Sequence, residues 1–337
     1  MPVRRDVVVL GASAGGVEAL RQLVGVLPAD FPAAILVVMH LAPGATSALP
    51  QILDRAGKLP AVAAAHGRPL AAGTIHVAPP DRHLLIEDGV QFLSHGPTES
   101  GHRPAVNATF RSAAVAAGPA AIGVVLSGAL DDGALGLCSI VERGGLAMVQ
   151  DPADALYPGM PESALARTPT EHVYPVGVLG GVLDELVRTP VPAAGPAPPS
   201  PALLLEDRIA RDGIRLDAVD PDTLSPPSGH SCPDCGGVLV EIGARNGYYR
   251  CRIGHAWSAE ALLGAHDLEF ERALWTALRS LDEKAALARR MQENGAGRSG
   301  LAGGRYETTV RECVAAAGTL RRFLLAQDTE NGRGHAG

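Results

Sequence analysis

The sequence predicts an α/β protein built on a doubly wound, mainly parallel sheet with helices on both faces. Two observations support this class. Short, continuous aliphatic runs such as residues 6–10 and 34–39 are typical of strands that are buried on both faces of a sheet. Stretches with apolar residues at helical spacing separate these runs, as in residues 16–26. A chain of 337 residues also has room for further modules.

The elements of the first half follow in order along the chain. Strands are expected at residues 6–10, 34–39, 74–78, 121–126 and 146–150. Helices are expected at residues 16–26, 46–56, 108–117, in the stretch that ends at Val141, and at residues 179–188. Residues 84–93 place Asp88-Gly89 between two apolar runs, which indicates a β-hairpin because a type I′ turn needs positive φ at both central residues.

The second half of the chain has a different character. Residues 189–201 read TPVPAAGPAPPSP and predict an extended linker, because so many prolines cannot form a core. A short helix is expected at residues 203–210, and two longer ones at about residues 259–292 and 306–326, as a C-terminal helical hairpin with a glycine-rich break between them. Apolar residues expected on one side of the first long helix are Leu262, Leu263, Phe270, Leu274, Leu278 and Leu281. The expected domains are residues 1–188, 189–228 (linker), 229–258, 259–328 and 329–337, the last a disordered tail.

Composition limits the classes of partner. The formal net charge of -7 argues against general nucleic-acid binding, which normally requires a basic face. The alternative, that the protein does bind nucleic acid, rests on a small basic cluster: Arg245, Arg250 and Arg252. No apolar run is long enough to span a bilayer, and the N-terminus leads into a strand instead of a signal peptide, so we expect a cytoplasmic protein without membrane insertion.

Polar residues directly follow three of the expected strands. Ser13 lies in the small-residue turn GASAG, His40 ends the run VVMH, and Asp132 follows the strand that ends at Leu126. The carboxyl ends of strands in a doubly wound sheet lie at one edge, where functional groups gather. A hydroxyl, an imidazole and a carboxylate are the nucleophile, the base and the orienting acid of acyl-transfer catalysis. Ser13 also lies at a helix N-terminus, where unpaired amides can stabilise an oxyanion.

Other uses of a glycine-rich turn fit less well. An α/β-hydrolase has the chain order serine, acid, histidine, whereas here the histidine precedes the aspartate. A dinucleotide site requires G-x-G-x-x-G and an acidic residue about 20 positions further on. Ser13 occupies the place of the second glycine, and no Walker lysine is present.

The motifs also resemble a known family. VVVLGASAGG, VVMHLAP, IHVAPPDRHLLI, GVVLSGALDDGALG and AMVQDPADALYPGMPESAL, in this order, are similar to the catalytic domain of CheB-type protein-glutamate methylesterases of bacterial chemotaxis. The resemblance covers residues 6–188 and implies a serine hydrolase that releases methanol from glutamyl methyl esters of chemoreceptors, and in some members also deamidates glutamines. It implies Ser13 as nucleophile, His40 as base and Asp132, instead of Asp131, as third member. Asp131 is expected to be solvated or to cap a helix. No cofactor is expected for this catalysis.

The resemblance also suggests which residues contact the substrate or stabilise the oxyanion: Ala14, Gly128, Ala129, Arg103 and Met160. Ala14 stands where the family usually has Thr, and Ala129 where it usually has Met. Asn107 stands where the family usually has Asp. The receiver domain usual in the family has no counterpart before residue 6. These departures motivate two alternatives: a catalytically altered protein-binding or signalling module, and an esterase that acts on a substrate outside chemotaxis.

Clustered cysteines predict a second site. SCPDCGG gives Cys232-x2-Cys235, and CRIGH gives Cys251-x3-His255, with a hairpin expected between the pairs and its turn at residues 244–247. Such spacing is typical of a zinc ribbon with structural Zn²⁺, and four protein ligands leave no open coordination position. We expect this module and the helices after it to serve dimerisation or partner docking. The methylated chemoreceptor, or another methylated protein, is the expected substrate.

Overall fold

The computed structural model describes residues 4–41, 44, 46–191, 198–212, 227–242, 247–293 and 301–331. Outside these ranges lie residues 192–197 and 213–226 of the expected linker, residues 244–246 of the expected turn, residues 294–300 of the expected break between the long helices, and residues 332–337 of the expected tail. The chain divides into two compact units, residues 1–262 and residues 263–337.

A parallel sheet organises the first unit. Among the described residues, seven strands pair in the order β3-β4-β2-β1-β7-β8-β9, and every neighbouring pair is parallel. The strands are β1 (Val7–Ala12), β2 (Ala34–Met39), β3 (Ala61–Ala63), β4 (Ile75–Val77), β7 (Ala121–Val125), β8 (Leu146–Gln150) and β9 (Val173–Tyr174). β1, β2 and β7 are buried along their whole length, as their continuous aliphatic sequences require.

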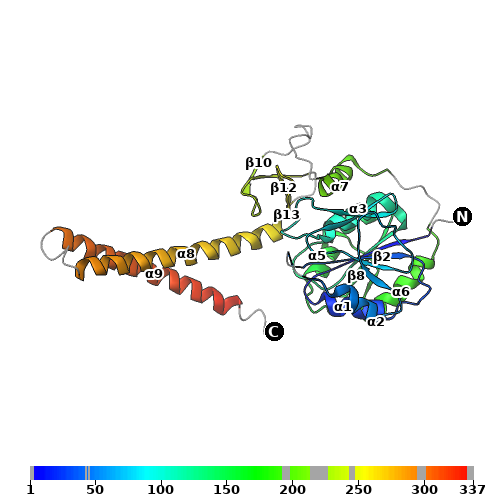
Figure 1. Ribbon diagram of the computed structural model, residues 1–337, viewed down its shortest axis with the longest axis horizontal. Helices are drawn as coiled ribbons and strands as arrows, with labels where there is room; N and C mark the ends of the chain where they lie inside the picture. The colour runs from blue at the N-terminus through cyan, green and yellow to red at the C-terminus, as the bar shows by residue number, and fades with distance from the viewer. Residues whose placement is uncertain are drawn as a thin grey trace. The chain divides into compact units, whose positions relative to one another are not determined.

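Helices cover both faces of this sheet (Figure 1). On one face lie α1 (Gly16–Gly25), α2 (Leu49–Ala56) and α6 (Val176–Arg188). On the other lie α3 (Val106–Ala117), α4 (Ala134–Glu142) and α5 (Gly159–Arg167). The two apolar clusters consist mostly of Ala, Val, Leu and Ile. The structure therefore confirms the predicted fold class, while α5, β3 and β9 were not predicted.

The predicted hairpin is confirmed. β5 (His83–Glu87) pairs antiparallel with β6 (Val90–Ser94), and both central turn residues have positive φ, 46° at Asp88 and 76° at Gly89. Its inner face packs against α3.

The short helix after the linker is α7 (Pro201–Asp212), longer than predicted, and it packs against α3. Four antiparallel strands follow: β10 (Pro227–Ser231), β11 (Val238–Glu241), β12 (Tyr248–Cys251) and β13 (Ala256–Ser258). We call residues 227–242 and 247–258 the Cys-rich module. It belongs to the same compact unit as the parallel sheet.

The predicted long helices are α8 (Ala259–Glu293) and α9 (Leu301–Asn331). α9 is longer than predicted at both ends, and it includes residues 329–331, which were expected in the disordered tail. Within the second unit, Leu278, Ala317 and Leu324 form a small core, and Arg321 donates to Asp282 at 2.5 Å. Leu263 and Phe270, expected on the packed side, are 64% and 49% exposed. Among the described residues, no helix combines the length and the hydropathy that a membrane-spanning segment requires.

Candidate active site

Ser13 lies where the sequence predicts it, between β1 and the N-terminus of α1. Its backbone amide donates to the Ser127 carbonyl at 3.0 Å, which ties the turn to the loop after β7. Gly15 closes the turn with φ 72°, and a Cβ there would lie 2.7 Å from Ser127 Oγ. Only glycine suits that position, and the turn leaves the serine side chain at the edge of the sheet.

His40 follows β2 directly and connects the other two predicted residues. Its Nδ1 lies 3.1 Å from Ser13 Oγ, and its Nε2 lies 2.7 Å from Asp132 Oδ2. The side chains of His40 and Asp132 are only 8% and 3% exposed. The three side chains predicted from the sequence are therefore in contact, at the carboxyl ends of β1, β2 and β7.

Asp132 is held as an anion. Its carboxylate accepts hydrogen bonds from the backbone amides of Val106, at 2.6 Å, and Asn107, at 2.9 Å, in the first turn of α3. Burial raises the pKa of this carboxyl, but the hydrogen bond and charge of His40 together with the two amides outweigh it and lower the pKa to about 2. Near neutral pH the group is a carboxylate, and it can accept a hydrogen bond from an N–H group of the His40 imidazole.

Asn107 stands where the family usually has Asp, and its side chain has a defined structural contact. Its side-chain oxygen accepts from the amides of Gly133, at 3.1 Å, and Gly136, at 2.7 Å, at the start of α4. The same residue thus ties α3 to the loop that carries Asp132. A neutral amide supplies this acceptor without a second charge beside the Asp132 carboxylate.

Asp131 differs from expectation. The sequence favours a solvated side chain or a helix cap, but the residue is 4% exposed and accepts a 2.7 Å hydrogen bond from Ser258 of the Cys-rich module. α4 has Gly133 at its N-cap and no side-chain cap.

Of the residues suggested for oxyanion binding, Gly128 and Met160 lie together beside Ser13. Gly128 lies against Ser13, since a Cβ at Gly128 would be 3.0 Å from that of Ser13 and 2.0 Å from Met160 Sδ. The Gly128 amide is already bonded to the Tyr157 carbonyl at 3.0 Å. The amides of Ala14 and Ala129 make no hydrogen bond within the described residues. These two amides remain available as donors, because a backbone amide does not depend on the side chain that the residue carries.

The Arg103 guanidinium is hydrogen-bonded within the protein. Its Nε and Nη2 donate to Asp81 Oδ1 at 2.9 and 2.6 Å, and its Nη1 donates to the Gly96 carbonyl at 2.9 Å. It lines a cavity of about 410 Å³ that also borders His40. The contacts with Asp81 and Gly96 indicate that Arg103 stabilises the wall of this cavity.

His102, which the sequence did not single out, contacts the predicted base. Its ring is stacked on that of His40 with centroids 3.7 Å apart and planes 6° from parallel. Burial, and then the neighbouring charge of His40, lower the pKa of His102 to about 4, so its ring is neutral near neutral pH.

The predicted metal ligands are also brought together. The ligand atoms of Cys232, Cys235, Cys251 and His255 all lie within 4.8 Å of one another, and this group could hold a metal ion. Sγ of Cys235 and Cys251 are 3.6 Å apart, far beyond a disulfide bond.

A doubly wound sheet with a hydrogen-bonded serine, histidine and aspartate at its carboxyl edge has the arrangement of a serine hydrolase. The family model for CheB methylesterase matches residues 8–183, more than half of the chain. The chain belongs to the CheB methylesterase family.

Named relatives and a solved structure agree with this assignment. The chain is 42% identical over 185 residues to protein-glutamate methylesterase/protein-glutamine glutaminase 2 of Anaeromyxobacter dehalogenans, covering 55% of this chain and 54% of that one. It is 38% identical over 193 residues to the protein of the same name from Methanosarcina mazei, covering 55% and 52%. The crystal structure of the Thermotoga maritima CheB methylesterase catalytic domain matches with a TM-score of 0.53 and 33% identity, over 55% of this chain and all of that one. The chain thus spans about half the length of the curated relatives.

Proposed function

We propose that the protein is a serine hydrolase that removes methyl groups from glutamyl methyl esters of methylated, chemoreceptor-like proteins. The observation that carries the proposal is the continuous contact from Ser13 through His40 to Asp132. The names of the relatives, protein-glutamate methylesterase/protein-glutamine glutaminase, support the glutamyl ester as substrate and glutamine as a second one.

The direction of proton transfer follows from the contacts. Ser13 Oγ–H donates to His40 Nδ1, which must therefore be unprotonated, and His40 Nε2–H donates to Asp132. When Ser13 Oγ attacks the ester carbonyl carbon, His40 takes the hydroxyl proton, and the Asp132 carboxylate stabilises the resulting imidazolium. The Ala14 and Ala129 amides are the proposed donors to the oxyanion.

Breakdown of the tetrahedral intermediate uses the same proton. His40 returns it to the methoxy oxygen, the carbon–oxygen bond breaks, and methanol leaves an acyl-Ser13 ester. Water then attacks that ester, with His40 again accepting a proton and delivering it to Ser13 Oγ. The net reaction consumes one water and yields methanol and a glutamate side chain. For a glutamine substrate the leaving group is ammonia.

Methanol release tests the proposal. Wild-type protein incubated with receptor membranes carrying radiolabelled methyl esters should release labelled methanol, and Ser13→Ala protein should not. Ser47→Ala, a change in an ordinary loop hydroxyl that bonds the Leu49 amide, is a matched control that should retain activity. Turnover of other methylated proteins but not of receptors would redirect the substrate. Absence of turnover with any ester would contradict the enzymatic role and favour a binding module.

We further propose that Cys232, Cys235, Cys251 and His255 hold a structural Zn²⁺. Tetrahedral zinc with bonds of about 2.3 Å to sulfur places neighbouring ligand atoms about 3.8 Å apart. The separations here are similar: 3.8 Å from Cys232 Sγ to His255 Nδ1 and 3.5 Å from Cys251 Sγ to the same nitrogen. Thiolate and imidazole together are the ligands that zinc favours, and four of them complete the coordination.

Elemental analysis tests the zinc proposal. Purified protein should contain about one zinc per chain, and Cys235→Ser should lose most of it. Cys138→Ser is the control, because Cys138 lies in α4 with its sulfur 2.8 Å from Thr168 Oγ1. Protein prepared without chelators that contains no zinc would contradict the proposal.

A further inference from the structure

A tight turn carries His102 to the catalytic base. Glu99 and His102 exchange backbone hydrogen bonds of 3.1 and 2.9 Å. The two residues between them, Ser100 and Gly101, have φ of 49° and 75°, as a type I′ turn requires. We call residues 99–102 the His102 turn. Its position decides whether the His102 ring lies on His40.

The Cys-rich module holds this turn by its backbone. The Ala256 amide, in β13, donates to the Thr98 carbonyl at 3.1 Å, and the Ser100 amide donates to the Ala256 carbonyl at 2.7 Å. Together they form a parallel bridge between Glu99 and Ala256. The turn is therefore paired, through its backbone, with β13, the edge strand of the module.

Side chains of the module reinforce the same contact. The Trp257 indole lies against Gly101, where an added Cβ would be 3.4 Å from Cη2. Its Nε1 donates to Asp234 Oδ2 at 3.1 Å, and Thr98 Oγ1 donates to the same oxygen at 3.0 Å. One carboxylate of the module thus joins the indole to the residue just before the turn.

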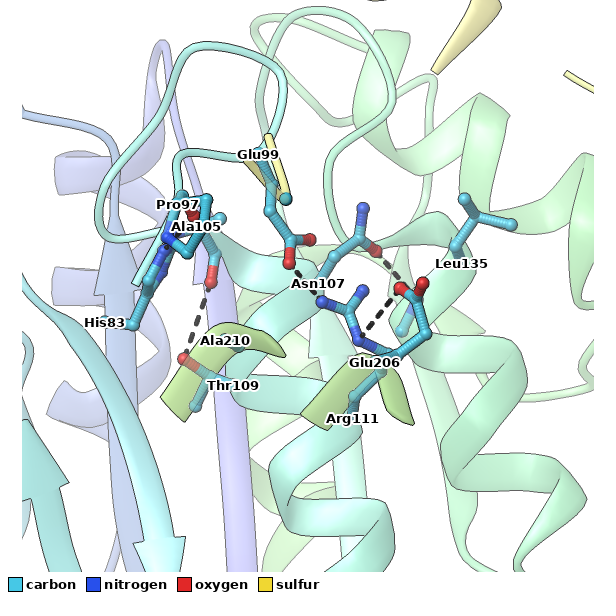
Figure 2. A network of polar contacts seen from close by, with 12 residues as sticks. His83, Pro97, Glu99, Ala105, Asn107, Thr109, Arg111, Leu135, Glu206 and Ala210 are labelled. Atoms are coloured by element: carbon cyan, nitrogen blue, oxygen red, sulfur yellow. Dashed lines mark hydrogen bonds and ion pairs between the residues drawn. The ribbon is translucent and has the colours of Figure 1, made fainter. Parts of the chain in front are cut away.

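The Glu99 side chain enters a buried ion cluster. Figure 2 shows Arg111 of α3 between the carboxylates of Glu99 and Glu206. Arg250 of β12, fully buried, donates to Glu206 at 2.8 and 2.6 Å and to Glu99 at 3.2 Å. Two arginines and two glutamates balance in charge, so the burial of each is compensated by partners on other elements. The cluster joins the turn, α3, α7 and the module.

We propose that the Cys-rich module is a positioning element of the catalytic centre: it holds the His102 turn so that the His102 ring fixes the orientation of the His40 imidazole. The inference rests on the proposed role of His40 as base. The base must keep its two ring nitrogens aimed at Ser13 and Asp132 through the reaction, and a ring stacked in parallel restricts its tilt. Trp257 is the positioning residue that acts most directly.

Charge supports this arrangement. The titratable groups that act on the His102 ring are His40, at the end of β2, and Asp132, in the loop before α4. Because burial and His40 lower the pKa of His102, the stacked ring stays neutral. It therefore does not repel His40 when that ring becomes an imidazolium.

The test is an NMR titration of the histidine rings in full-length protein, with methanol release measured alongside. In wild type, His102 should titrate near pH 4. Trp257→Ala should free the turn, expose the ring and bring its titration up by a unit or more, and should lower kcat about 10- to 100-fold with little change in KM. Trp257→Phe, which keeps a ring against Gly101, should restore most of both. Val238→Ala, an exposed change in the same module, should alter neither.

Thr98→Val breaks the contact with Asp234 from the other side and leaves the module's own residues intact. It should move the His102 titration in the same direction by a smaller amount, and it remains informative if Trp257→Ala protein does not fold. An unchanged His102 titration in folded Trp257→Ala or Thr98→Val protein would overturn the inference. If His102 shifts as expected but wild type hydrolyses no ester, the proposed function fails while the contact between module and turn stands.

Discussion

The parallel-sheet region and the Cys-rich module are stabilised by different kinds of interaction. In the sheet, the largest fully buried side chains are aliphatic and aromatic, among them Leu10, Ile35 and Leu36. In the module, the largest is Arg250, an ion held by two carboxylates, beside four predicted metal ligands. Apolar burial stabilises a region without demanding one geometry, whereas ion pairs and ligand sets stabilise it only when the partners are correctly placed. The module is therefore suited to fixing the position of a turn.

Among the substitutions compared here, one at Asp132 should reduce the rate of ester hydrolysis most. Asp132→Asn should lower kcat/KM about 10⁴-fold, because an amide cannot stabilise the imidazolium and disturbs its tautomer. Circular dichroism should confirm that the variant folds. Asp131→Asn, one residue away and bonded to Ser258, is the matched control, and an equal loss in both variants would contradict the assignment of roles.

A core substitution tests whether the sheet depends on apolar burial alone. Leu36→Ala, at a fully buried position of β2, should reduce the free energy of unfolding by about 2–5 kcal/mol. Leu36→Met, with similar volume, should cost less than about 1.5 kcal/mol. Urea denaturation measures both. A Leu36→Ala cost below that of Leu36→Met would mean that this position is not packed as described.

Lowering the pH should weaken the buried ion pairs between Glu206 and its two arginines, whereas the apolar core of the sheet does not depend on pH. Burial raises the pKa of Glu206, but Arg250 and then Arg111 outweigh it and lower the pKa from 4.5 to about 2. A depressed folded-state pKa stabilises the protein above the unfolded value and loses that contribution as the pH falls from about 4.5 to 2. Glu206→Gln should be less stable at neutral pH and should show a flatter loss of stability over that window. Thermal unfolding at a series of pH values measures this, and an unchanged slope would refute it.

The sequence predicted the parallel sheet and the meeting of Ser13, His40 and Asp132 because both depend on local patterns. Continuous aliphatic runs identified β1, β2 and β7. Ser13 follows β1, His40 follows β2, and Asp132 lies in the loop after β7. The three-residue β3 and two-residue β9 are too short to leave a pattern. α5 was not predicted either, although the resemblance singled out Met160 in it.

The contacts of the module could not be predicted, because the residues that make them lie far apart in sequence. Arg250 was counted with Arg245 and Arg252 as a small basic cluster for nucleic acid, but its side chain is fully buried and paired with Glu206 and Glu99. Only the fold brings β12, α7 and the His102 turn together. The stacking of His102 on His40 depends on the same long-range arrangement.

The central claim, that Ser13 and His40 act as one catalytic unit, is tested most directly by the rates of methyl-ester hydrolysis of Ser13→Ala, His40→Ala and the double variant. Residues that act as a unit lose nearly all activity when either is removed. The account predicts that the double variant is no slower than the slower single variant. Losses that multiply in the double variant would show that the two residues act independently and would contradict it.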